Sequence, residues 1–117
     1  MRSPMLIALG ALACGAFAAC QDSDVSRAVG ARCERSSDCD DRCLGPSGDW
    51  PAGFCTIDCD SDSDCPSDAA CVREDDSGVC AFTCLADPGC SFLGAGYACK
   101  ERDSIRDTSV KVLVCRG

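Results

Sequence analysis

Histidine is absent from the 117-residue chain, and aromatic residues make up only 5% of it. Without histidine there is no imidazole base near neutral pH, which excludes His-dependent catalytic triads and His metal sites. Basic residues are also scarce, since 11 Lys and Arg stand against 19 Asp and Glu, for a formal net charge of −8. Because binding to a phosphate backbone relies on Lys and Arg, this balance argues against a nucleic-acid partner.

Large apolar side chains are few, whereas cysteine is abundant. Residues 21–117 contain only 18 Val, Ile, Leu, Phe, Trp and Tyr residues, while the chain holds 14 cysteines. Such a composition is typical of scaffolds in which disulfides, worth about 2–4 kcal/mol each, supply stability that a small core cannot. We therefore expect a small disulfide-rich fold of short β-hairpins and irregular loops, with little or no helix in the mature part.

Residues 1–19 have the pattern of an export signal. Arg2 precedes an apolar run from Met5 to Ala19, which is short for a membrane-spanning helix and typical of a signal peptide. The run ends in Phe17-Ala18-Ala19-Cys20, which resembles a bacterial lipobox, where small residues precede a cysteine that becomes lipidated. Ala16-Phe17-Ala18 alternatively fits ordinary signal-peptidase cleavage before Ala19.

Cysteine parity favours lipidation of Cys20. Removing residues 1–19 takes away Cys14 and leaves 13 cysteines, an odd number that leaves one thiol to explain in an oxidising compartment. A lipid on Cys20 leaves twelve for six disulfides, and residues 20–32 are then the lipidated cysteine and a flexible tether with a reach of about 20 Å. The alternative is a secreted protein with Cys20 unmodified or paired between chains.

Three tandem units follow, covering residues 33–58, 59–83 and 84–117. In each unit five residues separate the first two cysteines, and three residues separate the fourth cysteine of the first and second units from the next unit. The twelve cysteines are Cys33, Cys39, Cys43 and Cys55, then Cys59, Cys65, Cys71 and Cys80, then Cys84, Cys90, Cys99 and Cys115. An even number per unit favours bridges within units but leaves three connectivities open in each. First–third and second–fourth pairing is preferred, because it would pin the leading loop onto a hairpin.

Turn signals place a hairpin at the end of each unit. Asp75-Asp76-Ser77-Gly78 separates strands expected at 70–73 and 79–82. In the third unit, a β-branched strand at 110–114 is expected to pair with 97–101 across a polar loop, 102–109. The loop at 45–51 occupies the corresponding place in the first unit.

Taken together, these features resemble the cysteine-rich repeat lipoproteins found in myxobacteria and related bacteria. The resemblance covers residues 17–117 and rests on FAAC at 17–20, on the constant spacings, and on DSDSDCP at 60–66. It implies a protein anchored by lipid in the bacterial cell envelope, at the outer membrane or the surface. It implies a scaffold and a location, and no particular activity.

Two sets of residues could bind metal instead. The Cys-x3-Cys spacings would suit zinc in a reducing compartment, but behind an export signal we expect these thiols to be oxidised. Asp58, Asp60, Asp62 and Asp64 alternate as in calcium loops, although Ser63 and Ala69 stand where an EF-hand needs Gly and Glu. We expect a solvated acidic loop, with weak calcium binding as the alternative, and no cofactor.

The remaining candidates point to binding rather than catalysis. Trp50, the only tryptophan, either covers the disulfide core or is an exposed binding residue. No G-x-S-x-G motif or base–nucleophile pair is present, and acidic pairs such as Glu74 and Asp75 are expected to be solvated.

The leading hypothesis is a non-enzymatic, membrane-anchored binding or display module. Lipid on Cys20 would hold it at the membrane, and a protein partner would meet loops 44–54 and 100–114. One alternative is a secreted inhibitor of a protease or other enzyme, because disulfide-framed loops such as 45–51 are pre-organised for a cleft. The other is weak calcium-dependent adhesion through residues 58–64.

Overall fold

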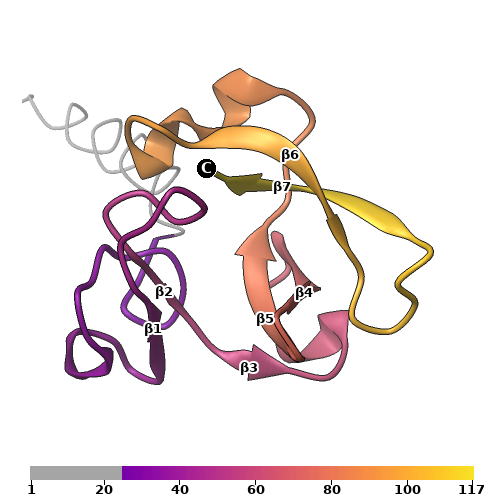
Figure 1. The fold of residues 1–117 in the computed structure, drawn as a ribbon, viewed down its shortest axis with the longest axis horizontal. Helices are drawn as coiled ribbons and strands as arrows, with labels where there is room; N and C mark the ends of the chain where they lie inside the picture. Colours follow the sequence, from indigo (N-terminus) through magenta and orange to yellow (C-terminus); the bar gives the residue numbers. More distant parts are fainter. Residues whose placement is uncertain (1–24) are drawn as a thin grey trace, which may run out of the picture.

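The computed structural model describes residues 25–117, which form seven short strands and three 3-10 segments (Figure 1). The elements in chain order are η1 (Ser36–Asp38), β1 (Arg42–Leu44), β2 (Phe54–Thr56), β3 (Asp58–Cys59), η2 (Asp62–Asp64), β4 (Ala69–Glu74), β5 (Ser77–Phe82), η3 (Asp87–Leu93), β6 (Ala98–Asp103) and β7 (Lys111–Arg116). This confirms the expected small disulfide-rich fold of short antiparallel strands. Within residues 25–117, no helix is long and apolar enough to cross a membrane.

Each unit is a 3-10 turn followed by an antiparallel strand pair. The third and fourth cysteines of a unit lie directly opposite each other in that pair, as Cys43↔Cys55, Cys71↔Cys80 and Cys99↔Cys115. They are not bonded to one another, because each is bonded to a cysteine of the leading turn. The bridges are Cys33–Cys43, Cys39–Cys55, Cys59–Cys71, Cys65–Cys80, Cys84–Cys99 and Cys90–Cys115. The first–third, second–fourth connectivity is therefore confirmed in all three units.

The predicted hairpins are present, with longer strands than expected. Strands β4 and β5 join through Asp75 and Asp76 alone, and Asp75 adopts φ +56°, a conformation that Asp tolerates better than most residues. In the third unit β6 and β7 extend to Asp103 and Arg116, so the connecting loop is 104–110. The strands continue into the predicted loop because Asp103 lies opposite Lys111 and forms a cross-strand ion pair with it.

An aromatic cluster joins the units into one domain. The ring of Phe54 in the first unit lies 6.0 Å from Phe82 of the second and 6.3 Å from Tyr97 of the third, measured between centroids. Trp50 packs 5.0 Å from Phe54, and Phe92 packs 5.4 Å from Phe82. Because each unit contributes rings to the same cluster, the main core is shared by all three units, and only a small cluster around Cys33, Cys39 and Cys55 lies apart from it.

Backbone contacts also cross the unit boundaries. Strand β3 pairs with β5, which gives a three-stranded sheet in the order β3-β5-β4. Isolated bridges link Val72 to Ser104 and Thr83 to Val114. In Figure 1 the β6–β7 hairpin accordingly lies across one end of the β4–β5 pair.

Residues 25–32 pack against the domain, so the predicted flexible tether is wrong for this segment. Val29 is buried, the Gly30 N–H donates to the Cys55 carbonyl at 2.8 Å, and the Cys55 N–H donates to the Ala31 carbonyl at 2.8 Å. Gly30 adopts φ +103° with the Phe82 ring so close that a Cβ would lie 2.7 Å from it. The segment carries only two isolated valines, which gave no periodic signal of this burial.

Candidate functional site

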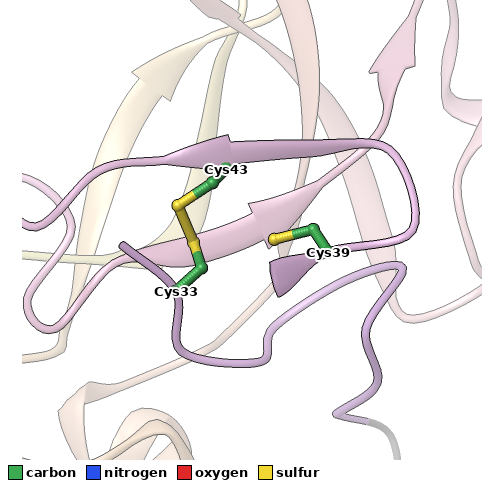
Figure 2. A group of neighbouring side chains, drawn as sticks. All are labelled: Cys33, Cys39 and Cys43. Atoms are coloured by element: carbon green, nitrogen blue, oxygen red, sulfur yellow. A yellow bond between two sulfur atoms is a disulfide. The ribbon is translucent and has the colours of Figure 1, made fainter. Parts of the chain in front are cut away.

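The sulfur clusters that could suggest a metal centre are pairs of adjacent disulfides. In each unit three sulfur atoms lie within 4.8 Å of one another, in the groups Cys33, Cys39 and Cys43; Cys59, Cys65 and Cys80; and Cys84, Cys90 and Cys115. Figure 2 shows the first group, with the Cys33–Cys43 bond beside the Sγ of Cys39. Metals bind thiolates, and every one of these sulfurs is in a disulfide. Six disulfides in so small a protein indicate an oxidising, extracytoplasmic environment.

In the first and second units, an aspartate closes the turn that lies between cysteines one and two of the unit. Asp38 accepts hydrogen bonds from the N–H groups of Glu34 (3.0 Å) and Arg35 (3.3 Å). These backbone bonds hold the pKa of Asp38 below its ordinary value. The corresponding bonds of the second unit run to Asp64 from the N–H groups of Asp60 (2.9 Å) and Ser61 (3.3 Å). The aspartate that precedes the second cysteine in both units, Asp38 and Asp64, therefore has a structural role in closing the turn.

A second aspartate ties the turn to the strand in the second and third units. Asp62 accepts the N–H of Cys71 at 2.8 Å, and Asp87 accepts the N–H of Cys99 at 3.0 Å. Both acceptors lie three residues before the second cysteine of their unit, and both donors are third cysteines. The carboxylate and the first–third disulfide therefore hold the same strand against the leading turn.

The four calcium candidates have different hydrogen-bond and ion-pair partners. Asp62 and Asp64 bind backbone N–H groups as just described, and Asp58 pairs with Arg42 at 2.7 Å. Asp58, Asp60 and Asp64 line a surface depression together with Asp76 of the β4–β5 turn. Within residues 25–117, however, the only close groups of three or more potential metal ligands are cysteine groups. The geometry therefore assigns Asp62 and Asp64 to turn closure.

Trp50 is 2% exposed, so the alternative of an exposed binding residue is wrong. Its ring packs on Phe54, and its Nε1–H donates to Glu74 at 3.4 Å. The loop around it is also tied down, because Arg116 binds the Asp49 carboxylate at 2.5 Å and the Gly117 N–H binds the Asp49 carbonyl at 2.7 Å. Loop 44–54 thus packs against the C-terminus of the described chain, and its exposed residues are 45–49 at the tip and Ala52.

Glu74 was expected to be solvated, and the structure corrects this. Its carboxylate forms an ion pair with Arg102, whose Nε also donates to the Arg73 carbonyl at 3.0 Å. The side chains of Glu74 and Arg102 are only 13% and 21% exposed. Glu74 thereby joins Trp50 of the first unit to Arg102 of the third. A turn-adjacent Glu in sequence carries no signal of such a contact, because the partners lie 24 and 28 residues away.

Exposed large apolar side chains within residues 25–117 all belong to the third unit. They are Leu85, Phe92, Val110 and Leu113. Val110 and Leu113 lie in the predicted partner loop 100–114, whereas Leu85 and Phe92 were not singled out in the sequence. Leu85 is 94% exposed, more than any of the others. Unlike the buried Trp50, these four side chains could meet a partner without rearrangement.

Cys20, the predicted lipidation site, lies outside the described residues. Comparisons of the chain with protein-family models, with curated proteins and with solved structures find no match.

Proposed function

We propose that this chain is a non-enzymatic binding module of the bacterial cell envelope, anchored at the outer membrane or surface by lipid on Cys20. The complete pairing of the twelve cysteines from Cys33 to Cys115 carries the proposal. It leaves no partner for Cys20 within the domain. A thioether-linked lipid accounts for this remaining cysteine in an oxidising compartment.

The packing of residues 25–32 sets how far such a module would stand from the membrane. Between Cys20 and the packed segment there are only residues 21–24, which extend at most about 3.5 Å each, or roughly 17 Å across the five intervals. The domain would therefore be held within reach of the bilayer surface. A partner would be met at the membrane, not far out in the medium.

The third unit supplies the binding surface in this proposal. Its exposed apolar side chains include Val110 and Leu113, near the free end of the β6–β7 hairpin. Exposed apolar side chains of this size are a recurrent feature of protein-binding sites. The tip of loop 44–54 is polar and bound at Asp49, so we assign it a minor role.

The test is the intact mass of the mature protein from membranes, before reduction and after reduction and alkylation. We expect acyl mass on a chain that begins at Cys20, no thiol that reacts before reduction, and twelve that react after it. A matched Cys20→Ser variant should lose the acyl mass and the membrane association while keeping all six bridges. A wild-type chain that begins at Ala19, or that has no lipid, would contradict the anchoring.

A secreted or surface enzyme inhibitor is the second candidate, and the exposure of Leu85 favours it. The loop proposed for this role from sequence, 45–51, is bound at Asp49 and carries the buried Trp50, so the third unit is the better location.

A further inference from the structure

Leu85 occupies a position that is acidic in the other two units. The residue after the first cysteine is Glu34 in the first unit, Asp60 in the second and Leu85 in the third. The residues that follow, Arg35, Ser61 and Ala86, share one extended conformation, with φ between −148° and −157° and ψ near 165°. The third unit thus presents an almost fully exposed leucine where the scaffold otherwise presents a charge.

The hydrogen bonding of the backbone N–H groups next to Leu85 also differs from that in the other units. Asp38 and Asp64 accept the two N–H groups that follow the first cysteine, but Gly89 stands at this position in the third unit. Within the described part of the chain, no hydrogen bond reaches the N–H of Leu85 or of Ala86. Extended segments that bind another protein use such main-chain groups together with an exposed side chain. The missing carboxylate therefore leaves this segment able to form intermolecular bonds.

The segment is nevertheless held on both sides. Before Leu85, the Cys84 N–H donates to the Leu113 carbonyl at 3.2 Å, and Thr83 is bridged to Val114. After it, the Gly89 N–H donates to the Ala86 carbonyl at 3.0 Å. Asp87, whose carboxylate accepts the Cys99 N–H, holds the same side of the segment. A peptide already fixed in this way loses little conformational entropy when it enters a cleft.

We propose that the Leu85–Ala86 segment is an inhibitory loop for secreted endopeptidases that prefer a large apolar residue on the acyl side of the scissile bond. Leu85 enters the enzyme's apolar specificity pocket, and its unpaired N–H pairs with the enzyme backbone. The inference rests on the proposed function as an exported binding module and names its partner class.

The disulfides explain why this loop would inhibit rather than be consumed. Attack by the enzyme's nucleophile bonds it to the Leu85 carbonyl carbon as the C–N bond breaks, and the Ala86 nitrogen takes up a proton. The new amine cannot leave, because Cys84, on the acyl side, is bonded to Cys99 on the amine side. Held next to the acyl carbon at high effective concentration, the amine can re-form the peptide and release the enzyme nucleophile. Complete hydrolysis adds one water and still leaves a single cross-linked molecule.

The test uses the full mature protein in detergent against three purified enzymes, a chymotrypsin-type protease, a subtilisin-type protease and trypsin. We expect the wild type to inhibit one or both of the first two and to leave trypsin active. Leu85→Asp should weaken that inhibition about 100-fold or more, as expected for a central binding residue. Leu85→Lys should transfer inhibition to trypsin, whose specificity pocket carries a carboxylate. Ser36→Lys, at an exposed position of the first unit outside the proposed binding surface, should change nothing.

A fourth variant tests the role of the unpaired N–H groups. Gly89→Asp restores the carboxylate of the other units, and a Cβ there meets nothing nearer than the Cys84 Cβ at 4.0 Å. It should keep all six bridges and lower inhibition at least 10-fold by occupying the N–H of Leu85. Cleavage of the wild type at the rate of an ordinary substrate, or undiminished inhibition by Leu85→Asp, would overturn the inference. If the protein carries acyl mass on Cys20 but inhibits none of the enzymes, the inhibitory loop is contradicted and the lipid-anchored module is not. If it inhibits but carries no acyl mass, the lipid anchor is contradicted and the inhibitory loop is not.

Discussion

The carboxylate of Glu74 is paired with the guanidinium of Arg102, and the same carboxylate accepts the indole N–H of Trp50. One side chain of the second unit therefore binds the first and the third units simultaneously. Both members of the ion pair are largely buried, so each charge depends on the other for its compensation. Removing one member of such a pair costs more than the pair contributes, because the remaining charge stays desolvated.

We expect Glu74→Ala to lower the free energy of unfolding by about 3 kcal/mol, since Arg102 would be left partly buried without a counter-ion. Urea denaturation with the disulfides intact is the measurement. The matched control is Asp76→Ala in the adjacent turn, where a fully exposed carboxylate lies 3.9 Å from Arg73. It should change stability by about 0.5 kcal/mol or less. Equal effects of the two variants would show that the junction does not hold the units together.

Gly53 is the second position where we predict a large effect. It adopts φ +81°, and a Cβ on its backbone would lie 1.9 Å from the Cys33 carbonyl oxygen. Gly53→Ala should therefore displace residues around the first disulfide and cost about 3 kcal/mol or more. Thermal unfolding of oxidised protein measures this, with Gly45→Ala as control because nothing lies within 4 Å of a Cβ there. A Gly53→Ala variant as stable as Gly45→Ala would contradict the tight approach.

The features that were predictable from sequence are those that repeat along it. Constant spacing and even cysteine counts indicated three units, and the Asp75–Gly78 turn indicated the hairpin of the second. The pairing of the first and third cysteines followed from the need to pin a loop onto that hairpin. Such contacts lie within about 25 residues, so local regularities report them.

Contacts between units could not be predicted from the sequence in this way. Val29 is buried next to Gly30, whose backbone lies against the Phe82 ring, and Glu74 is buried by partners from the other two units. No periodic pattern can report such tertiary placement. The alternative of Trp50 as an exposed binding residue was wrong, because a lone tryptophan in sequence does not indicate whether its ring is buried. The exposed Leu85 does have a signal in the sequence, because it stands at the position that is Glu34 and Asp60 in the other two repeats.

Tyr97 provides a pH-dependent prediction. Burial raises its pKa to about 12, with the Arg32 charge acting in the opposite direction, and its hydroxyl lies 3.4 Å from the Gly53 carbonyl. Unfolded tyrosine titrates near pH 10, so the folded state holds its proton longer. This stabilisation is complete below about pH 10 and is lost as the pH rises towards 12. Phenolate absorbance after a rapid pH jump isolates the group, because it is the only tyrosine. Titration near pH 10 in the folded protein would contradict its burial.

The two disulfides that close the longest and the shortest loops should contribute unequally. Cys90–Cys115 spans 25 residues and Cys33–Cys43 spans 10. Loop-closure entropy predicts losses of about 3.5 and about 2.7 kcal/mol when each pair is replaced by alanine. The measurement is guanidinium denaturation of the two double variants, with mass spectrometry confirming that the other five bridges are formed.

The location of the bridges should widen this difference. Cys90 and Cys115 are fully buried beside Val114 in the shared core, whereas Cys43 is partly exposed in a smaller cluster of the first unit. Replacing the buried pair therefore also leaves a cavity, which adds to the loss from chain entropy. If the Cys33–Cys43 variant were the less stable of the two, the leading unit, and not the third, would hold the domain together.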